Sequence, residues 1–174
     1  MALTTAQLAT LKAAIAADSE LAAIPNNPDG AFAIALLLNA TPVPDYWVWR
    51  SKVTQAECVS TTSPDGTTFS WSVYIGRSQG ERDAWREMFA DTGSVNPSNA
   101  NVRSAFADIF SGAGGATQRA HLLSIGRRKA TRGEKIFAAA TVGGSGQRGS
   151  SANPDTMGFE GSLTYNDVDT ARNS

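Results

Sequence analysis

Residues able to carry acid–base or nucleophilic chemistry are few and far apart in this chain. It has one histidine, His121, and one cysteine, Cys58. A hydrolase triad needs a nucleophile, a base and an orienting acid, and a tetrahedral zinc site needs more ligands than one imidazole and one distant thiol. The pattern around His121 is helical, which favours an ordinary helix residue, and nothing beyond residue type supports a glycosidase role for Glu57 or Glu134. We predict no enzymatic activity, no catalytic or metal site and no cofactor.

Glycine-rich runs and clustered carboxylates point the same way. The run at 112–115 lacks the Lys-Ser or Lys-Thr that completes a phosphate-binding loop. The sequence GGSGQ at 143–147 resembles a nucleophile elbow, but the sequence pattern predicts neither a strand before it nor a helix after it. Glu81, Asp83 and Glu87 alternate with arginines, which is typical of a solvated helix face rather than an acid–base pair.

One cluster of cations is the strongest charge feature. Five basic side chains lie within nine residues, with Glu134 as the only acid among them, and they are Arg127, Arg128, Lys129, Arg132 and Lys135. They could contact phosphates, form a solvated helix connection, or meet acids of a neighbouring subunit. No aromatic residues interleave with them as single-strand binders require. We predict that they lie at a subunit interface or on a channel wall.

Composition indicates a globular protein rather than a disordered one. Apolar residues make up 41% and charged residues 18% of the 174 residues, with a net charge of −1. The charge is uneven, because residues 71–140 hold ten of the fifteen Lys and Arg against six acids. Lone Cys58 allows no intrachain disulfide, and the apolar run 31–38 is too short to cross a bilayer. We expect a soluble intracellular protein, or part of a particle assembled inside a cell, with no membrane partner.

Apolar spacing predicts a mainly α fold, a small helical bundle with room for one short β-hairpin and an extended C-terminal tail. Helices are expected after Thr4 or Thr5 and over 31–40, the latter capped by Asp29 and apolar nearly all round. Capping boxes at 54–57, 78–81 and 131–134 predict three further helix starts. The segments YWVWRSKV and FSWSVY suit strands. The four tryptophans are expected in the core, with an interface as the alternative: Trp47, Trp49, Trp71 and Trp85.

Composition changes abruptly after residue 138. The stretch AATVGGSGQRGSSANPDT is rich in Gly and Ser, and the apolar motif MGFEGSLTYNDV follows it. We therefore predict a helical body over 1–138 and, over 139–174, a Gly/Ser linker with a C-terminal extension that binds a partner. The residues expected to be buried against the portal or a neighbouring subunit are Met157, Phe159, Leu163, Tyr165 and Val168.

Several strings together resemble one protein family. They are LxxxIxxDxELAAIPNNPDGAFAIALLLNA, VWR at 48–50, F-x-W at 69–71, NPSNANVR, KATRGEKIFAAAT and TMGFEGSLTYNDVDTAR. They cover nearly the whole chain and are similar to small structural proteins of tailed bacteriophages and prophages, associated with the head-to-tail connector (adaptor) layer. The resemblance implies a largely helical protein of the virion, assembled in the host cytoplasm, whose C-terminal extension grips the portal.

The partners implied are the portal protein, a tail tube or nozzle protein, further copies of the chain in a twelve-fold ring, and genomic DNA in non-specific contact. Three alternatives stay open. The chain could be another virion component that decorates the capsid or completes the tail, a small DNA-binding protein acting through residues 127–135, or a cell-wall hydrolase carried in the virion. Copy number, salt-dependent DNA binding and a zymogram would distinguish them.

Overall fold

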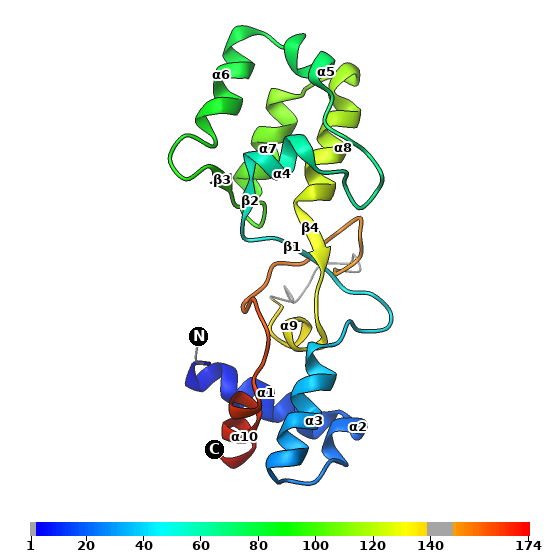
Figure 1. Ribbon diagram of the computed structural model, residues 1–174, viewed down its shortest axis with the longest axis vertical. Helices are drawn as coiled ribbons and strands as arrows, with labels where there is room; N and C mark the ends of the chain where they lie inside the picture. Colours follow the sequence, from blue (N-terminus) through cyan, green and yellow to red (C-terminus); the bar gives the residue numbers. More distant parts are fainter. Residues whose placement is uncertain (1–2, 139–147) are drawn as a thin grey trace. The chain divides into compact units, whose positions relative to one another are not determined.

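The computed structural model describes residues 3–138 and 148–174 and divides the chain into two compact units (Figure 1). Unit 1 consists of Met1–Val48 and Lys129–Ser174, and unit 2 of Trp49–Arg128. This division differs from the expected one, because the C-terminal segment belongs to the same unit as the first helices. Residues 139–147, which begin the predicted linker, lie outside the described residues.

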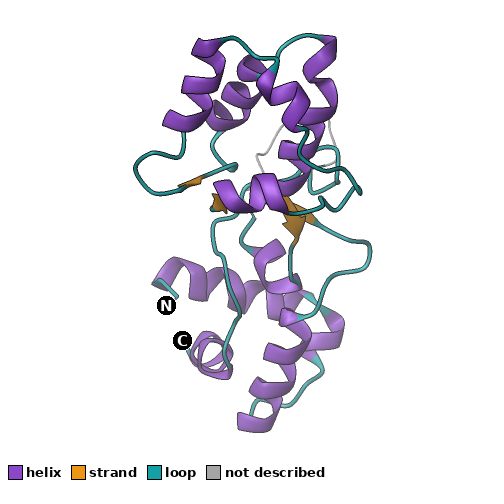
Figure 2. Cartoon of the chain, turned by 45° about the horizontal axis from the view of Figure 1, so that its top comes forward, coloured by secondary structure: helices purple, strands orange, loops and turns teal. Residues whose placement is uncertain are grey.

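Helices account for most of both units, which confirms the predicted mainly α fold (Figure 2). The elements of unit 1 are α1 (Thr5–Ala17), α2 (Ser19–Ala22), α3 (Pro28–Asn39), α9 (Arg132–Ile136) and α10 (Tyr165–Asn173). Those of unit 2 are β2 (Val53–Thr54), α4 (Gln55–Ser60), α5 (Trp71–Ile75), α6 (Gln79–Glu87), β3 (Ser94–Val95), α7 (Ala100–Ile109), the 3-10 turn η1 (Ala113–Gly115) and α8 (Ala116–Ile125).

Two small sheets complete the fold. Strand β2 pairs antiparallel with β3, with Val53 opposite Val95 and Thr54 opposite Ser94. Strands β1 (Trp47–Trp49) and β4 (Arg127–Lys129) form the other pair. The chain passes from one unit to the other within these two strands.

Local sequence signals explain where most helices begin. Capping boxes form at Thr54–Glu57, Ser78–Glu81 and Thr131–Glu134, as predicted, and Thr4 forms one with Gln7 at the start of α1. Two details of the prediction were wrong. Asn27, not Asp29, caps α3, because its side-chain oxygen accepts a hydrogen bond from the Gly30 amide at 2.8 Å. With the cap at Asn27, Pro28 occupies the first turn of the helix, where proline is tolerated.

The second error concerns FSWSVY, predicted as a strand. Residues 71–75 form α5, whose first turn is capped by the Ser70 hydroxyl. Phe69 is buried, whereas Trp71 is 54% exposed, so the expectation of a core position for Trp71 was also wrong. The alternation of Phe69, Trp71 and Val73 therefore does not mark one buried face.

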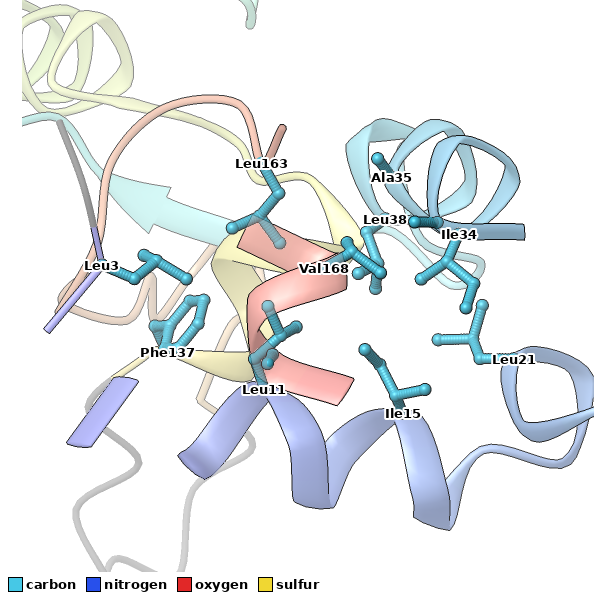
Figure 3. Close-up of a cluster of buried hydrophobic side chains, with 12 residues drawn as sticks. Leu3, Leu11, Ile15, Leu21, Ile34, Ala35, Leu38, Phe137, Leu163 and Val168 are labelled. Atoms are coloured by element: carbon cyan, nitrogen blue, oxygen red, sulfur yellow. The ribbon is translucent and has the colours of Figure 1, made fainter. Parts of the chain in front are cut away.

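The core of unit 1 joins helices from both ends of the chain (Figure 3). Leu11 and Ile15 of α1, Ile34 and Leu38 of α3, and Val168 of α10 are all buried. Burying an aliphatic side chain of this size contributes about 1.5–3 kcal/mol relative to leaving it in water. Helix α10 is therefore part of the core of unit 1.

An aromatic cluster fills the core of unit 2. The Trp85 ring lies 5.7 Å from Phe69, 5.6 Å from Phe110 and 6.3 Å from Phe106, measured between centroids. Such tilted and edge-on arrangements add to the gain from burial alone. The cluster holds α6, α7 and the segment before α5 together.

Candidate interaction surface

His121 is fully buried and both of its ring nitrogens have partners within unit 2. Nε2 lies 2.8 Å from the Cys58 carbonyl oxygen, and Nδ1 lies 3.3 Å from the Thr67 hydroxyl and 3.1 Å from its carbonyl oxygen. With hydrogen on Nε2, the ring donates to Cys58 and its Nδ1 accepts from the Thr67 hydroxyl. His121 thus ties α8 to α4 and to the loop before α5.

Cys58 is equally unsuited to nucleophilic chemistry. Its side chain is buried in the core of unit 2, and desolvation raises the pKa of the thiol to about 12. Because the thiolate is the reactive form, the native side chain is inert at neutral pH.

Glu57 and Glu134, the two glutamates considered for a glycosidase role, cap different helices in different units. Glu57 closes the capping box of α4 and pairs with Arg50 at 2.5 Å. The Thr54 amide hydrogen bond, opposed by desolvation and supported by Arg50, lowers the pKa of Glu57 below its ordinary value. Glu134 is buried and accepts from the amides of Thr131 and Gly161, each at 3.0 Å. Both carboxylates hold backbone amides in place.

Within residues 3–138 and 148–174, no three of the His, Cys, Asp and Glu side chains are grouped as a metal site requires. In the same part of the chain, no helix has the length and apolar character needed to cross a membrane.

The predicted basic cluster is divided between the two units, and much of its charge is paired. Arg127 of unit 2 contacts Asp65 at 2.5 Å, and Lys129 of unit 1 contacts Asp45 at 2.7 Å. Arg132 pairs with Asp18 through Nη2 and with Glu20 through Nη1, each at 2.9 Å. The Nζ of Lys135 lies 5.4 Å from the Tyr46 ring centroid, while Arg128 also has an interaction within the chain.

Arg132 also borders an open pocket of about 620 Å³ in unit 1. Apolar side chains line it, among them Leu21, Leu38 and Ile136, and Asp18 and Glu20 stand beside Arg132. The arginine and these acids pair with one another, and Lys135 also lines the pocket, so its wall is part apolar and part charged.

The C-terminal residues differ from the prediction that all five are buried against neighbours. Leu163 and Val168 are buried in the core of their own unit, so for these two the prediction was wrong. Phe159 packs partly against the same core, with its ring 5.3 Å from Phe137, and Met157 is half-buried. Tyr165 is 39% exposed. The apolar residues of the segment divide between an inward and an outward side.

Hydrogen bonds explain why the segment packs on its own unit. The Asn39 side chain binds both polar groups of Leu163, donating to its carbonyl at 2.8 Å and accepting from its amide at 2.9 Å. The Gly158 amide donates to the Phe137 carbonyl, and Arg172 donates to the Ile24 carbonyl, both at 2.9 Å. Together with the buried apolar side chains, these bonds offset the entropy lost on ordering the segment.

Helix α10 had a sequence signal that the prediction did not use. Thr164 and Asp167 form a capping box, with Asp167 in the position that Glu or Gln usually takes. Val168 and Ala171 then follow at helical spacing and are both buried. A helix at 165–173 could thus have been predicted, although the surface that covers it could not.

Among the described residues, exposed large apolar side chains gather on two faces. On the first, the rings of Phe32 and Tyr165 stack with centroids 4.3 Å apart, and Phe32 is 56% and Leu36 75% exposed. We name Phe32, Leu36 and Tyr165 the α3–α10 face. The second lies in unit 2, where Trp71 and Ile75, the latter 65% exposed, form the α5 face. Clustered exposed apolar side chains are typical of protein-binding surfaces.

Neither the family models nor the curated proteins and solved structures with which the chain was compared give a match.

Proposed function

We propose that this protein is a non-enzymatic structural component of a tailed-phage particle, a head-to-tail adaptor that links the portal to the tail around the DNA channel. The observation that carries the proposal is the α3–α10 face. Helix α3 buries Ile34 and Leu38 in its own core and turns Phe32 and Leu36 to solvent. A helix that is apolar on both sides needs a second partner to cover the outer side.

The residues whose side chains could carry out chemistry support a structural role. His121, Cys58 and Glu134 are buried and engaged within the fold. The side chains of His121 and Glu134 join separate segments of the chain, His121 through the Cys58 carbonyl and Glu134 through the Gly161 amide. The chain thus uses its reactive side-chain types to position its elements.

The contact with the portal or a neighbouring subunit, predicted from the sequence for the C-terminal segment, is now proposed for a different surface. Leu163 and Val168 hold the C-terminal segment on unit 1, whereas Tyr165 presents its ring outward beside Phe32. We propose that the α3–α10 face is a contact surface within the particle, and that Met157 and Phe159 contribute through the parts left accessible. Arg127, Lys129 and Arg132 serve mainly to hold the fold through their carboxylate partners, and the cluster makes only weak contact with passing DNA.

Incorporation into particles tests this proposal. The double variant Phe32→Ser/Leu36→Ser removes two exposed apolar side chains without touching the core. Each such side chain contributes about 1.5–3 kcal/mol when a partner buries it fully, and about 1.4 kcal/mol is a tenfold change in affinity. We expect at least a tenfold loss of incorporation in a particle that supplies the portal, measured by quantitative mass spectrometry of purified virions.

Val43→Ser is the matched control, because Val43 is also apolar, lies in the same unit and is 98% exposed. It should be incorporated normally. Equal incorporation of the double variant and the unsubstituted protein would refute a role for the α3–α10 face. The copy number in the same virions decides between an adaptor ring and a capsid-decorating protein, which would be present in far larger numbers.

A further inference from the structure

We infer that the α3–α10 face of one copy docks on the α5 face of a second copy, so that the chain associates head to tail with itself. This inference rests on the proposed assembly role and assigns the contact between neighbouring subunits. The two faces belong to different units, and each is exposed in the single chain.

The α3–α10 face combines apolar side chains with an acidic rim. Phe32 and Leu36 are four residues apart and therefore lie on one side of α3, next to Tyr165. Asp29 lies one turn before Phe32 and is exposed, and Asp169 lies one turn after Tyr165. Unit 1 as a whole is acidic, with nine Asp and Glu against six Lys and Arg.

The α5 face has the opposite rim. Trp71 and Ile75 are also four residues apart on one side of their helix. Arg82 donates to the Ile75 carbonyl at 2.8 Å, which fixes a guanidinium group at the end of this face. Unit 2 is basic overall, with nine Lys and Arg against seven Asp and Glu.

Charge complementarity identifies the occupant of each face. Among residues 3–138 and 148–174, neither Asp29 nor Arg82 has an ion-pair partner. Two α3–α10 faces brought together would oppose like charges, and so would two α5 faces, which is unfavourable. An α3–α10 face against an α5 face covers apolar side chains on both sides and sets an acidic rim against a basic one.

Such a contact has a defined consequence for assembly. The two surfaces are different, so every copy keeps one free α3–α10 face and one free α5 face after each addition. Contacts of this kind produce a closed ring or an open filament, according to the rotation between neighbours, and never stop at a symmetric dimer.

Mixing two single variants of the full chain tests the inference. Leu36→Glu disables the α3–α10 face and Ile75→Glu the α5 face, and both positions are exposed, so the fold is preserved, as circular dichroism would verify. In sedimentation velocity the unsubstituted chain should associate with rising concentration, whereas each variant alone should stay monomeric. The mixture should form a heterodimer, in which the intact α5 face of Leu36→Glu binds the intact α3–α10 face of Ile75→Glu. Nothing larger should form, because a further contact would bring the two introduced glutamates together.

Other outcomes overturn the inference. A chain that stays monomeric up to about 1 mM, the weak end of the affinity range, has no such contact. If Ile75→Glu still dimerises alone while Leu36→Glu does not, the α3–α10 face pairs with itself. Val43→Glu adds the same charge at another exposed site of unit 1 and should associate as the unsubstituted chain does.

Charge reversal tests the complementary rims separately. Asp29→Arg and Arg82→Asp should each weaken association about tenfold at low salt, and the chain carrying both reversals should recover most of that loss. If the double reversal associates no better than the single ones, the rims do not face each other. Normal particle incorporation of Ile75→Glu, which disables only the α5 face, would leave the proposed adaptor role standing and remove only this contact.

Discussion

Replacing Leu163 by alanine probes whether the C-terminal segment is part of the core of unit 1. Leu163 is buried among residues of α1, α3 and α10, and a methyl group placed on Gly133 would lie 2.7 Å from its Cδ1 atom. Its surroundings are therefore closely packed, and a shortened side chain leaves a cavity. Leucine-to-alanine substitutions in such sites destabilise by about 2–5 kcal/mol.

That loss is large against a total stability of about 5–15 kcal/mol for a domain. We expect Leu163→Ala to lower the protection of amides in α1, α3 and α10 against hydrogen exchange, by about 30-fold or more at the lower end of this range. Amides of α7 and α8 in unit 2 should change little. Hydrogen exchange followed by mass spectrometry resolves these elements in one experiment.

Ser162→Ala is the matched control, since this neighbouring side chain is exposed and its removal should change stability by less than about 0.5 kcal/mol. The reasoning would be refuted if Leu163→Ala matched that control, or if α10 of the unsubstituted chain exchanged as fast as an unfolded peptide. In either case the segment would not be held on unit 1, and the original expectation of a free, partner-binding tail would return.

Three further outcomes follow from single side chains. Asn39→Ala should destabilise the packing of Leu163 by about 1–3 kcal/mol, because it leaves two backbone groups without their partners, and the same exchange experiment measures it. The pKa of Glu57 is lowered in the folded chain, so its contribution is present above the ordinary glutamate pKa of 4.5 and is lost as pH falls through the folded value; Glu57→Gln should flatten this acid limb in urea titrations. Cys58 should resist a thiol reagent at neutral pH until denaturant unfolds unit 2, because burial raises the pKa of its thiol to about 12.

The starts of several helices were predicted correctly, because they depend on hydrogen bonds between residues close in sequence. The capping boxes at Thr54, Ser78 and Thr131 lie within four residues each, and their hydrogen bonds form whatever the surrounding fold. The predicted cap of α3 was wrong because two residues near the start of this helix can each cap it. Asn27 and Asp29 can both cap, and only the backbone path into α3 selects Asn27.

Contacts between residues far apart in the chain could not be predicted from the sequence. The spacing of Leu163, Val168 and Ala171 indicates that one side of the segment is apolar, but it does not indicate which surface covers that side. Asn39, which binds the Leu163 backbone, lies 124 positions earlier in the chain. No pattern around either residue indicates that they meet, so a free tail was as consistent with the sequence as a docked one.

The docked tail changes how assembly has to be understood. Tyr165 sits at the start of α10, and the same helix places Val168 and Ala171 in the core. The stacking of Tyr165 on Phe32 therefore exists only while the C-terminal segment is packed on unit 1. A core substitution such as Leu163→Ala weakens both stability and the outward face, whereas a substitution at Leu36 alters the face alone. Because the inward and outward sides of one short helix are coupled in this way, a chain presents a complete α3–α10 face only after unit 1 has folded. In the association that we propose, folding of unit 1 would thus come first, without any need for a separate signal.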